Sequence, residues 1–423
     1  MNKKHILLFI ACILVLVGVY NYPNTITLHL GVFAGSNWDV PSSGTSYKVI
    51  DGAIKRFEKN NPGIKVKYES GISKGDYSFW LSDKIVEGKE PDVFMILNDD
   101  FNTLSSIGAL TNITGYMKHD ENFKQSDYYE TVLKSGIYNA KQYALPYECD
   151  PTLMFVNKTL LSQLNIQLPD NNWTLDNFYN LCKRVSSSRY YAYYDYSWED
   201  ALYAYGASLF DEKGEKCNLD QRSVKEAILY TQKLKELNKN HDVTQEEFDK
   251  GQVAFAPMSL SVYRTYKPYP WRIKKYSTFE WDCLKMPSVK GNALGTQVST
   301  LLMGMSAKSK HKPQAWTLLK ELCYSEKTQL SLTQYSQGIS PLKKVARSKT
   351  ILEMLDEEAG DSKVSLSLLN QALLEARNRS KFKKYDSAMN LLDTRMNQII
   401  NSDSDVDLSL IQLQKDINKF LNE

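Results

Sequence analysis

The sequence has few of the residues from which metal centres and nucleophilic active sites are built. Its six cysteines form no C-x-x-C pair, and its five histidines stand singly, with no H-E-x-x-H motif. Because a zinc site needs clustered ligands, we predict no metal site and no cofactor. The five cysteines beyond Cys12 leave one or two disulfides open as an alternative to buried free thiols.

Motifs for nucleotide chemistry are missing as well. The chain has no G-x-x-x-x-G-K-[ST] phosphate loop and no G-x-G-x-x-G string. Lys and Arg number 52 against 49 Asp and Glu, a net charge of +3, so no basic field points to nucleic acid as a partner. A facing pair of carboxylates, as in a glycosidase, stays open as an alternative. We predict a binding protein without enzymatic activity.

Long apolar runs are absent except at the N-terminus. Lys3 and Lys4 precede an apolar stretch over residues 6–20, and polar residues 21–24 follow it, which is the layout of a secretory leader. As a helix the stretch would span about 22 Å, short of the ~30 Å hydrocarbon core of a bilayer. A cleaved signal peptide and a short membrane anchor therefore both remain open, and lipidation of Cys12, in the middle of the run, is a further alternative.

The chain instead shows an alternation of strand and helix patterns. Residues 26–33 and 64–68 alternate like strands, residues 47–58 and 79–86 carry helical stripes, and residues 92–97 form a short apolar run. Such runs are typical of strands buried on both faces. These residues predict an open α/β lobe.

A second series of elements follows, and with 423 residues the chain is long enough for two lobes. No low-complexity linker separates them, so we expect short hinge segments. The tail over residues 364–421 is predicted to be helical throughout. The remaining predicted elements are strands at 152–156, 253–256, 281–286 and 297–305, and helices from 174, at 224–234 and at 313–323.

Polar groups follow two of the predicted strands in the first lobe. Residues 36–39 and 98–100 come directly after strand patterns, and in open α/β sheets ligands bind beyond the carboxyl ends of the strands. Carboxylates there can accept hydrogen bonds from adjacent hydroxyls, and the indole of Trp38 can stack on a sugar ring. Asp99 has an alternative role as the N-cap of a following helix.

Two further segments are candidates for the lining of a cleft. Residues 147–150 sit at the expected crossing between the lobes, with a plain surface turn as the alternative.

The chain has 27 Tyr and 7 Trp, and nine residues from 190 to 198 include five tyrosines and a tryptophan. This run is either a packed strand or a sugar platform, with Tyr196 and Trp198 nearest the ligand.

Several stretches of the chain resemble the extracellular solute-binding protein family 1 of ABC importers, which includes the maltose-binding proteins. Weaker matches extend the resemblance from residue 25 to the end of the chain. The four stretches that carry it are residues 57–66, 91–94 with 107–110, 143–147 with 155–158, and 248–255.

The resemblance implies a two-lobed type II periplasmic-binding-protein fold of the α/β class, each lobe an open mixed sheet flanked by helices. Crossings between the lobes are expected near Leu145, near residues 288–292 and near residues 338–341. The implied division is residues 1–23 as leader or anchor, 24–144 with 293–337 as the N-terminal lobe, and 145–292 with 338–423 as the C-terminal lobe.

The resemblance also implies site residues. In maltose-binding relatives an acidic residue after the third strand and another past the first crossing contact sugar hydroxyls, and Asp99 and Asp150 occupy those positions. The position after Asp99, often basic there, holds Asp100, and Gly295-Thr296-Gln297 replaces the family's Gly-Gly. The predicted ligand-binding residues are Trp38, Asp99, Asp100, Tyr147, Glu148, Asp150, Tyr196, Trp198, Gln297 and Tyr335.

The function that follows from the resemblance is capture of a carbohydrate, an oligosaccharide in particular, by hinge closure and its delivery to membrane permease subunits. The missing phosphate loop fits, because the ATPase would be another chain. We expect a monomer at the extracellular face of the cell membrane, tethered by its N-terminal segment. A sugar sensor for a membrane receptor kinase and a secreted carbohydrate hydrolase are the alternatives.

Overall fold

A computed structural model describes residues 25–35, 37, 46–186, 189–264, 279–291, 295–359 and 365–423. The predicted leader with Cys12, and Trp38, lie outside these residues. The elements in chain order are β1 (Ile26–Gly31), α2 (Ser46–Asn60), β2 (Ile64–Tyr68), α3 (Lys74–Val86), β3 (Val93–Ile96), α4 (Phe101–Ser106), α5 (Thr114–His119), η1 (Gln125–Asp127), α6 (Glu130–Lys134), β4 (Ile137–Tyr138), β5 (Lys141–Gln142), β6 (Ala144–Asn157), α7 (Lys158–Gln163), α8 (Leu175–Val185), β7 (Tyr191–Tyr193), α9 (Trp198–Tyr205), α10 (Arg222–Leu237), α11 (Gln245–Asp249), β8 (Val253–Ser259), α12 (Leu260–Tyr263), β9 (Trp281–Leu284), β10 (Val298–Met305), α13 (Lys312–Cys323), α14 (Glu326–Tyr335), α15 (Lys343–Ala346), α16 (Lys349–Ala359), α17 (Leu366–Glu375), α18 (Tyr385–Ile400) and α19 (Val406–Asn422).

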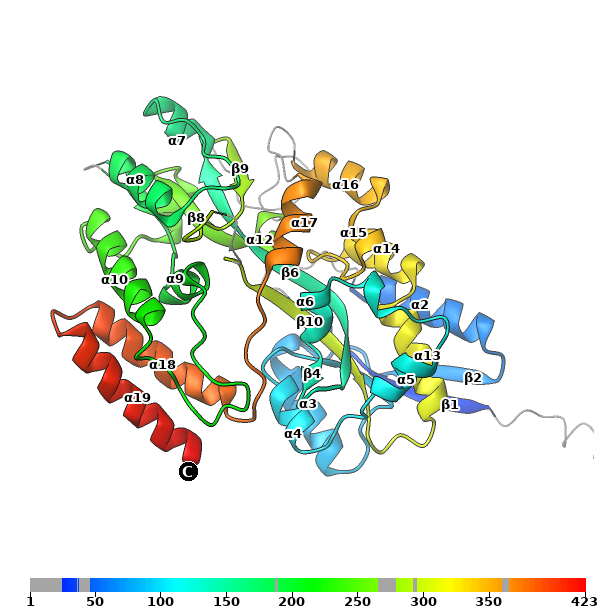
Figure 1. The fold of residues 1–423 in the computed structure, drawn as a ribbon. Coiled ribbons are helices and arrows are strands. Elements are labelled where there is room, and N and C mark those ends of the chain that lie inside the picture. Colours follow the sequence, from blue (N-terminus) through cyan, green and yellow to red (C-terminus); the bar gives the residue numbers. More distant parts are fainter. Residues whose placement is uncertain are drawn as a thin grey trace, which may run out of the picture.

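One eight-stranded sheet runs through the molecule in the order β2-β1-β3-β10-β6-β8-β7, with β9 also paired to β6. β1 is parallel to β2 and β3, whereas β10 is antiparallel to β3. At the other end β7 is parallel to β8, and β8 is antiparallel to β6. Helices flank both ends of this sheet (Figure 1). The predicted α/β architecture of two lobes with mixed sheets is confirmed.

Strand β6 belongs to both lobes. Residues up to Pro151 pair with β10, and residues from Thr152 onward pair with β8 and β9. In Figure 1 the two long strands β6 and β10 run side by side through the middle of the molecule. The change of partners comes between Pro151 and Thr152, later in the chain than the crossing that we expected near Leu145.

The C-terminal third divides differently from our expectation. α17 contacts α6 and β6, and both α15 and α16 contact α14, so these three helices pack beside first-lobe elements. The second lobe resumes with α18 and α19, which pack on α10 (Figure 1). The division implied by the resemblance instead places residues 338–423 in the second lobe. The apolar stripe of an amphipathic helix shows that the helix packs on a core but not on which lobe. The sequence therefore could not place the boundary between the lobes in this part of the chain.

Local sequence explains why the elements nearest the cleft form where they do. All four residues of β3 are buried, because the strand lies between β1 and β10. Thr174 is the N-cap of α8 and forms a capping box with Asn177. The helix thus begins where the sequence predicts one, from residue 174. The five described cysteines are buried free thiols, so none of them forms a disulfide.

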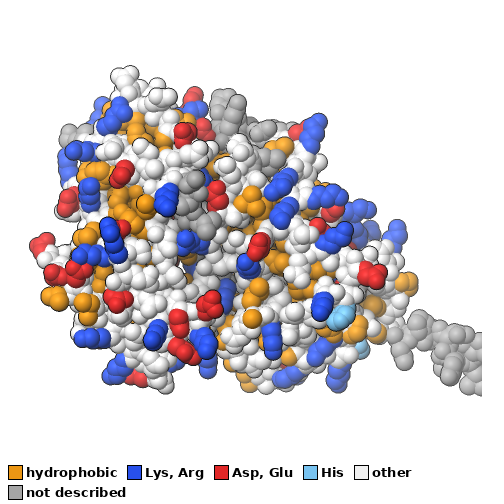
Figure 2. All heavy atoms as spheres, viewed as in Figure 1, with side chains coloured by type: hydrophobic (Ala, Val, Ile, Leu, Met, Phe, Trp, Pro, Cys, Tyr) orange, Lys and Arg blue, Asp and Glu red, His pale blue; other side chains and the backbone are white. Residues whose placement is uncertain are grey.

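The outer surface mixes both signs of charge. Figure 2 shows Lys and Arg side chains interspersed with Asp and Glu on the face viewed. This matches the near balance of 52 basic and 49 acidic residues, and it gives no extended basic surface on that face.

Candidate functional site

A cavity of ≈ 410 Å³ lies at the boundary between the lobes, where β6 passes from one to the other. Both lobes contribute to its wall, and most of the contributed side chains are polar. Its described lining is Asn37, Lys74, Leu97, Asn98 and Asp99 from the first lobe, Ser259, Ser261 and Val262 from the second lobe, Asp150, Ser299 and Thr300 from β6 and β10, and Arg379.

Asp150 lines this cavity from the middle of β6. Its side chain is buried, and the backbone N–H of Ser261 donates a hydrogen bond of 2.9 Å to its Oδ1 atom. Burial raises the pKa of this carboxyl to about 7, although hydrogen bonds from Ser261 and Ser259 oppose the rise. The group therefore takes up or releases a proton near neutral pH.

The polar turn after β3 supplies one of its two carboxylates to the cavity. Asp99 lines it with a side chain that is 75% exposed, and its Oδ1 atom lies 3.6 Å from Arg379 Nη1. Asp100 instead accepts a 2.6 Å hydrogen bond from Ser78 Oγ on α3, and burial raises its pKa. Asp100, not Asp99, occupies the N-cap position of α4, without a capping hydrogen bond from its side chain.

Arg379 is the main cavity residue that the sequence prediction missed. Its Nε and Nη2 atoms donate to the side-chain oxygen of Gln297, at 2.7 and 3.1 Å. We predicted an unbroken helical tail, but the chain leaves helical geometry between α17 and α18 and lies along the cavity there. The signal was present: residues 377–384 contain one apolar residue, Phe382, and so carry no helical stripe.

Serine and threonine hydroxyls on the cavity wall were also missed. Ser259 and Ser261 lie at the start of α12, and Ser299 pairs with Asp150 across the sheet. The buried hydroxyl of Thr300 has no hydrogen-bond partner among the residues the structure describes. Single hydroxyl residues in strands carry no pattern that marks them as ligand contacts.

Three of the predicted residues line a small neighbouring cavity of ≈ 40 Å³ instead, which shares Asn37 with the larger one. Tyr147 and Glu148 are buried in its wall, and the carboxylate of Glu148 accepts hydrogen bonds from the Gly338 N–H, at 2.8 Å, and from the Ser336 hydroxyl. Tyr335 accepts a 2.8 Å hydrogen bond from Lys48. These residues stand beside the inter-lobe cavity rather than in it.

Tyr196 and Trp198 lie in the core of the second lobe. Trp198 is 2% exposed and donates from its indole N–H to Asp393 on α18, at 2.8 Å. The ring of Tyr196 packs 5.2 Å from that of Phe178. The aromatic run forms β7 and the start of α9, and neither side chain lines the inter-lobe cavity.

One string in the first lobe has the letters of a hydrolase nucleophile elbow, G-x-S-x-G, over residues 71–75. Its serine, Ser73, is the N-cap of α3: the hydroxyl accepts from Asp76 N–H at 3.2 Å and donates to the Asp76 carboxylate at 2.6 Å. The serine therefore has a structural role at the start of this helix.

The sequence profile of the family described as bacterial extracellular solute-binding protein matches residues 41–329. The chain belongs to this family. This solute-binding protein is 30% identical over 140 residues to the multiple sugar-binding protein of Streptococcus mutans, a match that covers 32% of this chain and 30% of that protein. The resemblance predicted from the sequence is confirmed.

Solved structures share the fold over nearly the whole chain. The sugar-binding protein MalE of Xanthomonas citri superposes with a TM-score of 0.77 at 15% identity, over 94% of this chain and 97% of that one. The cyclic α-maltosyl-1,6-maltose binding protein of Arthrobacter globiformis does so with the same TM-score and identity, over 94% and 99%. At these identities the likeness shows the fold.

Two features are absent from the described residues. No helix among them is long and apolar enough to span a bilayer. No group of three or more His, Cys, Asp or Glu side chains in that part of the chain has an arrangement that could hold a metal ion.

Proposed function

We propose that this protein is the substrate-binding component of an ABC importer, that it captures a carbohydrate, an oligosaccharide in particular, in the inter-lobe cavity, and that it hands the sugar to a membrane permease. The observation that carries the proposal is the lining of that cavity. Asp99, Arg379, Asp150 and Ser261 all line it. Carboxylates, hydroxyls and a guanidinium are the groups that bind sugar hydroxyls.

Capture follows from the division of this lining between the lobes. A solute that contacts both lobes completes its hydrogen bonds only when they are close together, and so it favours the closed state. β6 and the segment before α18 connect the lobes and are the natural hinges. An affinity in the micromolar range, about −8 kcal/mol, needs only a few such hydrogen bonds.

The names of the relatives support sugar as the solute. The matched Streptococcus protein and both structural neighbours are sugar-binding proteins by name. None of the described residues that line the cavity is aromatic, so hydrogen bonding carries recognition there. Trp38 remains a proposed stacking residue. We further propose export and tethering at the outer face of the membrane by residues 1–23.

Thermal-shift and calorimetric titration test this proposal directly. The probes are glucose, galactose, maltose, maltotriose and raffinose, with spermidine and a tripeptide as probes that are not sugars. A binding protein is stabilised by its ligand and returns it chemically unchanged, which chromatography of the recovered sugar would verify. Stabilisation by spermidine or the tripeptide alone would refute sugar capture, and cleaved sugar would indicate a hydrolase.

A further inference from the structure

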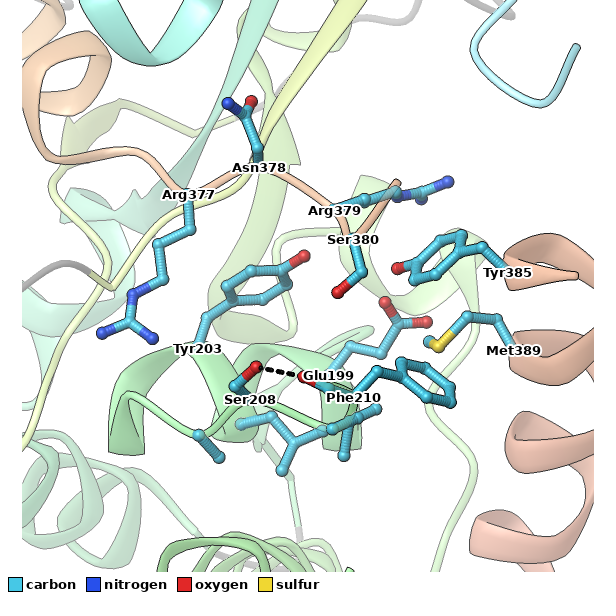
Figure 3. A pocket seen from close by; sticks show the side chains of 13 residues that line it. Glu199, Tyr203, Ser208, Phe210, Arg377, Asn378, Arg379, Ser380, Tyr385 and Met389 are labelled. Atoms are coloured by element: carbon cyan, nitrogen blue, oxygen red, sulfur yellow. Dashed lines mark hydrogen bonds between the residues drawn. The ribbon is translucent and has the colours of Figure 1, made fainter. Parts of the chain in front are cut away.

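Arg264 and Arg379 both lie near the segments that join the lobes, but only Arg379 lines the inter-lobe cavity. The Arg379 guanidinium contacts Asp99 and Gln297. In Figure 3 its side chain leads away from a pocket of ≈ 110 Å³ within the second lobe. Arg264 is not among the described residues that line either space. A role of Arg264 in solute capture must therefore be indirect.

Arg264 connects the second lobe to the first. It is the C-cap residue of α12, the short helix that follows β8, and it is 4% exposed. Its Nη1 atom donates a 2.8 Å hydrogen bond to the Gly338 carbonyl, and its Nη2 atom donates one of 2.9 Å to the Thr333 carbonyl. Thr333 lies in the last turn of α14, a helix that packs on α2 and α13 of the first lobe. Backbone carbonyls at a helix C-terminus lack partners within the helix and attract positive charge.

Gly338 is held on its other side by β6. Its N–H donates a 2.8 Å hydrogen bond to Oε1 of Glu148, which is buried. Gly338 thus meets a carboxylate at its N–H and a guanidinium at its carbonyl, and hydrogen bonds to charged groups are roughly twice as strong as those between neutral groups. The approach is close enough to need a glycine, because a Cβ atom at residue 338 would lie 2.4 Å from Glu148 Oε1.

The helix that Arg264 fastens also carries polar groups of the inter-lobe cavity. The backbone N–H of Ser261 donates to Oδ1 of Asp150, and both residues line that cavity. Asp150 lies two residues beyond Glu148 on β6. The contacts therefore form a closed ring, which passes from Asp150 through α12 to Arg264. It then returns through Gly338 and Glu148 to β6.

We propose that Arg264 is a positioning residue for solute capture, which holds α12 where the Ser261 N–H meets Asp150. The proposal rests on the proposed function and extends it to a residue that does not touch the solute. Glu148, which we predicted from the sequence as a ligand contact, belongs to the same ring. A displaced α12 would cost affinity, because hydrogen bonds weaken steeply as their geometry departs from the optimum.

A double-mutant cycle tests whether Arg264 acts through Asp150. Calorimetry with maltotriose compares the wild type with Arg264→Met, Asp150→Ala and the double variant. Methionine keeps most of the length of the side chain and removes the guanidinium. If Arg264 acts through Asp150, its loss matters mainly while Asp150 is present, whereas an independent structural effect would cost the same factor in both backgrounds.

Arg184→Met is the matched control, because this exposed arginine of α8 also donates to a backbone carbonyl, that of Asn165, at 3.2 Å. Arg184 lines neither the inter-lobe cavity nor the pocket of Figure 3. Thermal midpoints without sugar show which variants are folded. Arg264→Lys keeps the charge but cannot span both carbonyls, so it should lose affinity about threefold, and it replaces Arg264→Met in the cycle if that variant does not fold.

Hydrogen exchange followed by mass spectrometry gives a second measurement that needs no sugar. Residues 258–264 should exchange faster in Arg264→Met than in the wild type, because the ring no longer holds α12 against β6. Residues 175–185, which form α8, should exchange as in the wild type.

We expect Arg264→Met to weaken maltotriose binding about tenfold when Asp150 is present and less than about threefold in the Asp150→Ala background. Arg184→Met should leave the affinity unchanged. An unchanged affinity in Arg264→Met, equal factors in both backgrounds, or unchanged exchange at residues 258–264 would overturn the positioning role while sugar capture stands. Failure of the wild type to bind any sugar would overturn the proposed function, and the exchange measurement would still decide whether Arg264 holds α12 in place.

Discussion

Replacing Asp150 by Asn should make the protein more stable at alkaline pH. The side chain is 2% exposed, and burial raises its pKa from the usual 3.8 to about 7. The folded state thus holds the proton more tightly than the unfolded state. The stability that this provides is complete below about pH 4 and is lost as the pH rises toward 7. The difference in pKa corresponds to roughly 4 kcal/mol over the whole range.

Asparagine keeps the shape and the acceptor for the Ser261 N–H but does not ionise. The free energy of unfolding of Asp150→Asn, relative to the wild type, should therefore rise by roughly 3 kcal/mol between pH 5 and pH 8. Urea denaturation at the two pH values measures this directly. The same change at Asp99, whose side chain is 75% exposed, is the control and should show no such rise.

An equal difference between Asp150→Asn and the wild type at pH 5 and pH 8 would refute this reasoning. It would mean that the carboxyl is not held in the protonated form by burial. We expect Asp150→Asn to bind sugar more weakly, because a neutral amide accepts a weaker hydrogen bond from a sugar hydroxyl than a carboxylate does. We expect about tenfold weaker sugar binding at pH 8.

The remaining predictions concern the cavity edge, the crossing and the core. Arg379→Ala should weaken sugar binding about tenfold or more in calorimetry, whereas Arg395→Ala, an exposed change on α18, should leave it unchanged. Gly338→Ala should lower the free energy of unfolding by about 1–3 kcal/mol in urea titration, because the new Cβ would lie 2.4 Å from Glu148 Oε1; wild-type stability would contradict this contact. Trp198→Ala should lower the free energy of unfolding by about 3–5 kcal/mol, and Trp198→Phe should bind sugar as the wild type does. Loss of affinity in a folded Trp198→Phe protein would show that Trp198 contacts the sugar.

Local patterns were sufficient to predict most of the fold. Strand β2 matches its predicted bounds of 64–68, and β3 follows the apolar run that predicted a strand buried on both faces. A local sequence pattern cannot predict which elements pack together over long distances in the chain. The placement of α17 on α6 depends on tertiary contacts more than two hundred residues apart in the chain, and amphipathic stripes do not record them.

The site was predictable where a polar residue follows a strand or interrupts one. Asp99 after β3 and Asp150 within β6 both line the inter-lobe cavity, and Gln297 contacts its Arg379. The aromatic run could not be assigned, because tyrosine and tryptophan serve equally as core and as binding surface. Here Trp198 packs inward onto Asp393 of α18, a partner that only the folded chain brings near.

Calorimetric titration of the full chain with maltotriose and raffinose decides whether the inter-lobe cavity captures a carbohydrate. We expect one sugar bound per chain with micromolar affinity, weakened about tenfold by Arg379→Ala and unaffected by Arg395→Ala. Absence of heat with every sugar, together with a binding isotherm for spermidine or a tripeptide, would contradict the claim that the cavity between the lobes captures a carbohydrate.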